Sequence, residues 1–138
     1  MGVTTIEWTD RSINPIRARD TQTGAVGHYC EKLSPGCGHC YASTLQKRFN
    51  MPGFPGDGRS QRVTLPIFAG GPGIPNGSPG IPVGDNLEVF LDESKLQEVL
   101  RRRKPTKWFW CDMTDLFGSW VPDEWIAKCV AVMALTPW

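Results

Sequence analysis

Long hydrophobic runs are missing from this sequence. No stretch of about 18 apolar residues occurs, so we expect no membrane-spanning helix and no membrane partner. An excess of one charge is missing too, because 15 basic residues stand against 14 acidic ones. This balance creates no overall field for nucleic acid or anionic lipid. The N-terminus also lacks the charged-then-apolar pattern of a secretory signal, which favours a cytoplasmic protein.

A disulfide framework is a further absence. The five cysteines are an odd number, and Cys30, Cys37 and Cys40 are clustered, which fits metal binding in a reducing compartment. A Cys-x2-Cys turn can aim two sulfurs at one site, and the Pro35-Gly36 turn lets the first cysteine reach the same site. Three thiolates leave one coordination position open. This donor set is typical of a [4Fe–4S] cluster whose fourth iron binds another ligand.

Structural zinc is the competing interpretation, and the cysteine spacing leaves it open. The fourth zinc ligand would be His28, His39, Cys111 or Cys129. A common zinc site has two Cys-x2-Cys pairs, or one pair and two histidines, whereas this chain has a single pair. We expect His39 to be a loop residue or a hydrogen-bond donor to sulfur rather than a ligand.

The pattern of apolar residues predicts alternating strands and helices. We expect strands at 87–91 and 107–113, and helices at 41–49, 93–103 and 122–135. Asp92 is a suitable N-cap for the second of these helices. The strand at 107–113 has no polar face, as in strands covered on both sides. The order of elements therefore indicates an α/β fold with parallel strands.

Glycine and proline are concentrated in residues 51–86, which hold 9 of the 15 glycines and 7 of the 12 prolines. Such a composition excludes a regular helix or a central strand. We expect a long surface insertion, a Gly/Pro-rich loop that packs on the rest through its apolar side chains. The whole chain, 1–138, is expected to form a single domain.

Two carboxylates follow the predicted strand at 107–113. Ligands bind beyond the carboxyl ends of parallel strands, so Asp115 could contact a cofactor. It could equally order the turn before the next helix, and this structural role is favoured for Asp112. The basic run at 101–104 suits the end of a helix, with phosphate binding as the alternative.

Several segments together resemble the phage Gp thirty-seven/sixty-eight family, a radical-SAM-like group. They are IEWTD (6–10), NP (14–15), SPGCGHCYA (34–42), RKP (103–105), MTDLF (113–117) and VPDE through AVMAL (121–135). The resemblance implies the N-terminal part of a partial (β/α) barrel of radical-SAM type. It also implies that Cys30, Cys37 and Cys40 hold a [4Fe–4S] cluster and that S-adenosylmethionine (SAM) binds the open iron. Tyr41 and Asp115 would contact the cofactor.

The resemblance carries further implications. A one-electron donor would be a partner, and the substrate, which is unassigned, could be a nucleic acid or nucleotide. The spacing here is Cys-x6-Cys-x2-Cys, whereas radical-SAM enzymes usually have Cys-x3-Cys-x2-Cys. Members of the family are commonly longer, with more strands after the last helix. The resemblance therefore implies a missing C-terminal half, without which this chain would lack full activity.

Overall fold

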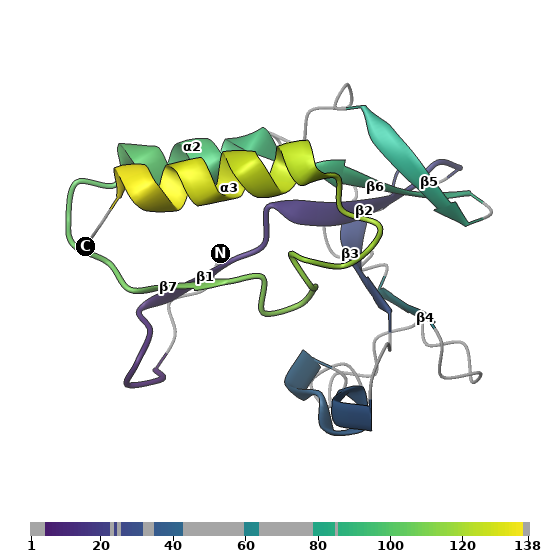
Figure 1. Ribbon diagram of the computed structural model, residues 1–138, viewed down its shortest axis with the longest axis horizontal. Helices are drawn as coiled ribbons and strands as arrows, with labels where there is room; N and C mark the ends of the chain where they lie inside the picture. Colours follow the sequence, from purple (N-terminus) through teal and green to yellow (C-terminus); the bar gives the residue numbers. More distant parts are fainter. Residues whose placement is uncertain are drawn as a thin grey trace.

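The computed structural model describes residues 5–22, 24, 26–31, 35–42, 60–63, 79–84 and 86–136. Their elements are, in chain order, β1 (Arg11–Ile13), β2 (Ile16–Asp20), β3 (Val26–Glu31), the 3-10 helix η1 (Pro35–His39), β4 (Ser60–Val63), β5 (Gly80–Gly84), β6 (Leu87–Leu91), α2 (Glu93–Arg101), β7 (Trp108–Trp110) and α3 (Asp123–Leu135). Figure 1 shows α2 and α3 on one side of the molecule and η1 at the other.

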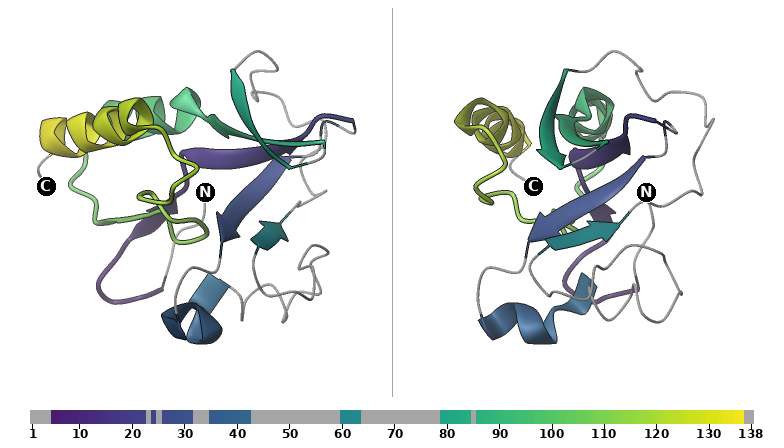
Figure 2. Two further views of the ribbon diagram at one scale, coloured as in Figure 1. Left: turned by 45° about the vertical axis from the view of Figure 1, so that its right-hand side comes forward. Right: turned by 90° about the vertical axis from the view of Figure 1, so that its right-hand side faces the viewer.

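The strands form two sheets. A five-stranded antiparallel sheet has the order β4-β3-β2-β6-β5, and a parallel pair joins β1 to β7. The two helices lie side by side over these strands (Figure 2). The protein therefore has a mixed α/β fold, but the predicted parallel strands are confirmed only for β1 and β7, because the larger sheet is antiparallel. The described strands close no barrel.

The predicted elements of the second half are mostly confirmed. β6 covers the expected residues, and Asp92 caps α2 by accepting a hydrogen bond from the Ser94 backbone N–H at 3.1 Å. β7 pairs in parallel with β1, as an α/β fold requires, but it is shorter than predicted. Cys111 ends it, because its φ of 56° is left-handed and cannot continue a strand. Of the helix predicted at 41–49, only 41–42 lie within the described residues, and both are helical.

The stretch 51–86 is not loop throughout, which corrects the prediction for that segment. Its described parts include β4, which pairs with β3, and β5, which pairs with β6. Both are edge strands. A proline such as Pro82 is tolerated there, because an edge strand has a neighbour on one side only. The register of β5 also shifts between Pro82 and Gly84. Glycine and proline thus exclude a central strand but permit an edge strand.

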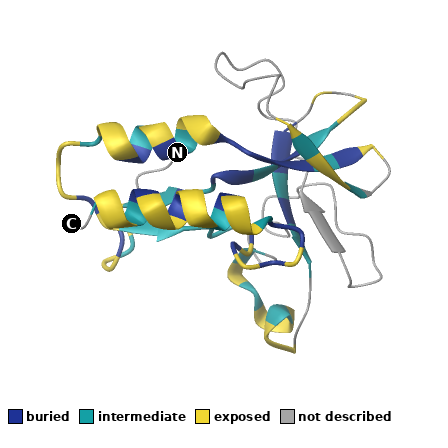
Figure 3. Cartoon of the chain, turned by 45° about the horizontal axis from the view of Figure 1, so that its top comes forward, coloured by how far each residue is buried: buried dark blue, intermediate teal, exposed yellow. Residues whose placement is uncertain are grey.

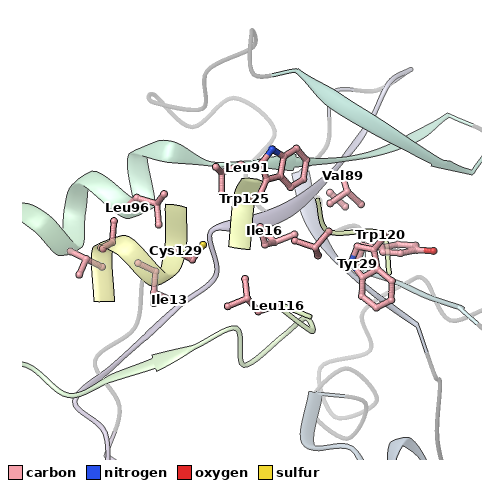
Figure 4. Packing of buried hydrophobic residues seen from close by; sticks show 14 of the residues in the cluster. Ile13, Ile16, Tyr29, Val89, Leu91, Leu96, Leu116, Trp120, Trp125 and Cys129 are labelled. Carbon is pink, nitrogen blue, oxygen red and sulfur yellow. The ribbon is translucent and has the colours of Figure 1, made fainter. Parts of the chain in front are cut away.

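One face of the five-stranded sheet and the inner faces of both helices enclose the core. Figure 4 shows Trp125 of α3 beside Leu91, Cys129 of α3 beside Ile16, and Tyr29 beside Trp120. The outer helix faces are exposed (Figure 3). In the described part of the chain, neither helix combines the length and the hydropathy that a bilayer-spanning helix requires.

Candidate functional site

The three clustered cysteines lie at the end of β3 and in the turn that follows. Cys30 is the fifth residue of β3, and Cys37 lies in η1. The backbone N–H of Cys40 donates to the carbonyl of Cys37 at 3.3 Å, so one turn holds both residues. All three side chains are half-buried, and all five cysteines of the chain are thiols.

The pKa of Cys30 shows which charged side chains act on its thiol. The pKa of Cys30 is raised to about 11, chiefly by burial and then by the negative charges of Asp115, Cys40 and Cys37. These three groups therefore lie close enough for their charges to act on the Cys30 thiol. Asp115, which is far away in the chain, thus lies within electrostatic range of Cys30, but the three predicted metal ligands form no metal site in the described part of the chain.

The arrangement of these thiols bears on the choice of metal. Among the described residues, no group of three or more His, Cys, Asp or Glu side chains forms a metal site. A zinc site needs its ligands to converge on one ion at about 2.0–2.3 Å. In a cluster each cysteine ligates a different iron, so the sulfurs need not meet at one point. The described residues show no assembled site for either a zinc ion or a cluster.

The loop after β7 carries Asp115 toward the thiols, and two residues that the sequence analysis missed hold this loop. The side-chain amide of Asn14 donates to Asp112, and its oxygen accepts from the Met113 backbone N–H at 3.1 Å. The buried hydroxyl of Thr114 donates to the carbonyl of Tyr29, the residue before Cys30. Asn14 and Thr114 both lie in segments that carry the family resemblance. That resemblance was the one sequence feature that could have pointed to them.

The predicted cofactor contacts differ in their surroundings. Asp115 is exposed, and its Oδ1 accepts a hydrogen bond from the Phe117 backbone N–H at 2.9 Å. Asp115 therefore orders the turn, and its charge also acts on the Cys30 thiol. Asp112 has the expected structural role, since it accepts from Asn14. Tyr41 follows the third cysteine and is 52% exposed.

A family model described as a protein of unknown function, DUF5131, matches residues 3–138. The chain belongs to the DUF5131 family. No curated protein and no solved structure matches it. Because the family description assigns no activity, the resemblance to radical-SAM proteins stays a prediction.

In this DUF5131 protein the other candidate zinc ligands lie in different surroundings. Cys129 is fully buried in the core, and Cys111 packs against that core. Burial raises the pKa of Cys111 to about 12 and that of Cys129 to about 11. His39 is exposed in η1. The Nδ1 atom of His28 is buried and has no hydrogen-bond partner among the described residues, and burial, helped by Arg17 and Lys95, lowers its pKa to about 4.

Proposed function

We propose that this DUF5131 protein is a radical-SAM-like iron–sulfur protein. Cys30, Cys37 and Cys40 would ligate three irons of a [4Fe–4S] cluster, and SAM would bind the fourth iron. The observation that carries the proposal is the placement of Cys30 in β3 and of Cys37 and Cys40 in the turn that follows, with the Asp115 charge acting on the Cys30 thiol. When bound, the cluster supplies the electron that reduces the sulfonium of SAM.

Each residue of this site has a definite task. The raised pKa of Cys30 keeps its thiol protonated at neutral pH, so cluster binding must displace that proton. The exposed carboxylate of Asp115 would attract the amino group of SAM. Thr114 positions that carboxylate, because its hydroxyl ties the loop to the strand carrying Cys30.

The architecture that we propose is the beginning of a partial (β/α) barrel. Its support is that β7 pairs in parallel with β1 and leads into α3, which is the order of a β/α unit. Asp115 lies in the loop after β7, at the carboxyl end of that strand, where α/β enzymes bind their ligands. An external one-electron donor is the partner that this chemistry needs, and a nucleic acid or nucleotide is the proposed substrate class.

Anaerobic reconstitution with iron and sulfide tests the proposal. The reduced protein should give a [4Fe–4S] EPR signal that shifts on adding SAM. Cys37→Ala should lose the signal, whereas Cys129→Ala, which also removes one thiol but from the core, should keep it. Asp115→Asn should keep the signal and weaken its response to SAM.

The opposite result is equally clear. A chain that takes up no iron and holds about one zinc would be a structural zinc module and would overturn the proposal. Equal losses of cluster in Cys37→Ala and Cys129→Ala would assign the effect to folding rather than to ligation.

A further inference from the structure

Basic side chains gather at the end of the molecule where α2 finishes. The run 101–104 is followed closely by Lys107, and Arg102 is the only one of these five that is not exposed. Arg102 donates through Nε to the hydroxyl of Thr106 at 2.9 Å. Within the described part of the chain, Arg101, Arg103 and Lys104 have no carboxylate partner.

An exposed aromatic ring lies on the same end. Trp8 is 60% exposed, and it contacts the ring of Phe109 edge to face, with the centroids 4.9 Å apart. This contact holds the indole while leaving most of its surface to solvent. Phe109 belongs to β7, so Trp8 is supported by the parallel pair of strands.

Backbone contacts join the basic run to the segment with Trp8. Lys107 accepts at its carbonyl from the N–H of Asp10 at 2.9 Å, and its Nζ donates to the carbonyl of Glu7 at 3.0 Å. Figure 1 shows the α2–β7 connection and the loop before β1 at the same end of the molecule. We call this surface the basic end, and it consists of Trp8, Arg101, Arg103, Lys104 and Lys107.

The charge of the basic end exceeds what its helix needs. The C-terminus of a helix carries roughly half a negative charge, which a single cation balances. Here the basic end carries four cations, beside the two carboxylates Glu7 and Asp10. One oxygen of Asp10 already accepts from the Lys107 N–H at 2.8 Å. An anionic ligand would therefore find a local excess of positive charge, although the whole chain is nearly neutral.

We propose that the basic end binds a single-stranded nucleic acid. Its phosphates would lie against Arg101, Arg103 and Lys104, and one base would stack on Trp8. Charge alone would suit an acidic protein equally well, but the exposed indole favours a ligand with flat bases. A duplex hides the faces of its bases, which favours a single strand. The surface includes none of the three clustered cysteines and needs no cluster.

Fluorescence anisotropy with a labelled oligothymidylate, at about 50 and 200 mM salt, tests the proposal on the purified chain. Binding should weaken as salt rises. The double variant Arg103→Gln/Lys104→Gln should reduce the slope of log K against log salt by about 0.7 for each cation removed. Trp8→Ala should weaken binding by about 5- to 150-fold at both salt concentrations, as the loss of one stacked base predicts.

Two matched controls separate this surface from general effects. Lys128→Gln removes an exposed cation on α3, and Phe117→Ala removes a ring that is 73% exposed in another loop. Both should bind like the unaltered chain. Absence of salt-dependent binding would overturn the proposal, as would basic-end variants that match the controls. If polyglutamate displaced the labelled oligothymidylate as well as unlabelled oligothymidylate does, the surface would be assigned to an acidic protein. If a duplex bound as tightly as the single strand and Trp8→Ala did not weaken that binding, stacking on Trp8 would have no role. A failed EPR test would leave this binding result unchanged.

Discussion

Removing the carboxylate of Asp92 should destabilise the protein strongly. Asp92 is 1% exposed, lies between β6 and α2, and accepts hydrogen bonds from the N–H and hydroxyl of Ser94. Its second oxygen is 3.1 Å from Nη1 of Arg17, whose side chain is only 12% exposed. The carboxylate therefore caps a helix and neutralises a nearly buried cation at the same time.

The two roles of Asp92 contribute different amounts to the free energy of unfolding. Loss of an N-cap costs about 0.5–2 kcal/mol, whereas breaking a buried ion pair costs about 3–5 kcal/mol, because the remaining charge stays buried without a partner. Asp92→Ala should therefore lower the free energy of unfolding by about 3–5 kcal/mol, a large share of the 5–15 kcal/mol typical of a domain. Asp92→Asn retains a capping oxygen and isolates the charge effect.

Urea denaturation of a double-mutant cycle measures these effects. Arg17→Met combined with Asp92→Asn removes both charges and keeps the cap, so the double variant should be more stable than Asp92→Asn alone. A loss of less than about 1 kcal/mol in Asp92→Ala would refute the reasoning, because it would fall within the range of exposed pairs. Strict additivity in the cycle would show that Arg17 and Asp92 do not interact.

Two further predictions concern the loop after β7 and the core thiols. Gly118→Ala should lower the free energy of unfolding by about 1–3 kcal/mol and lower the Tm, because the new Cβ would lie 2.5 Å from the buried ring of Trp120. Gly38→Ala is the control, because a Cβ there would have nothing within 4 Å. Equal Tm values for the two variants would contradict the prediction. The pKa values of Cys111 and Cys129 are raised to about 12 and 11, which leaves little reactive thiolate. At pH 8 both should react with iodoacetamide at least about 100-fold more slowly than in the urea-unfolded chain, as measured by mass spectrometry. Equal rates in the folded and unfolded chains would refute this. Because the unfolded chain releases these protons first, the free energy of unfolding should also fall as pH rises above about 9.

Local patterns predicted the elements whose causes lie within a few residues. The N-cap at Asp92 and the boundaries of β6 follow from neighbouring residues. The β2–β3 hairpin did not stand out, because its second strand includes Gly27 and His28 and depends on pairing with β2. β4 and β5 were also missed, since an edge strand is formed by its partner more than by its own composition.

The sequence by itself determined the three-thiol donor set, the capped helix and the basic run, because each depends on residues that are close in the chain. Only the tertiary structure decided which distant groups meet them. The hydrogen bond from Thr114 to Tyr29 spans 85 positions and brings the Asp115 loop to Cys30. The contact of Lys107 with Glu7 spans 100 positions and places the basic run beside Trp8. Such contacts follow from how strands pair and loops close, which no local pattern encodes.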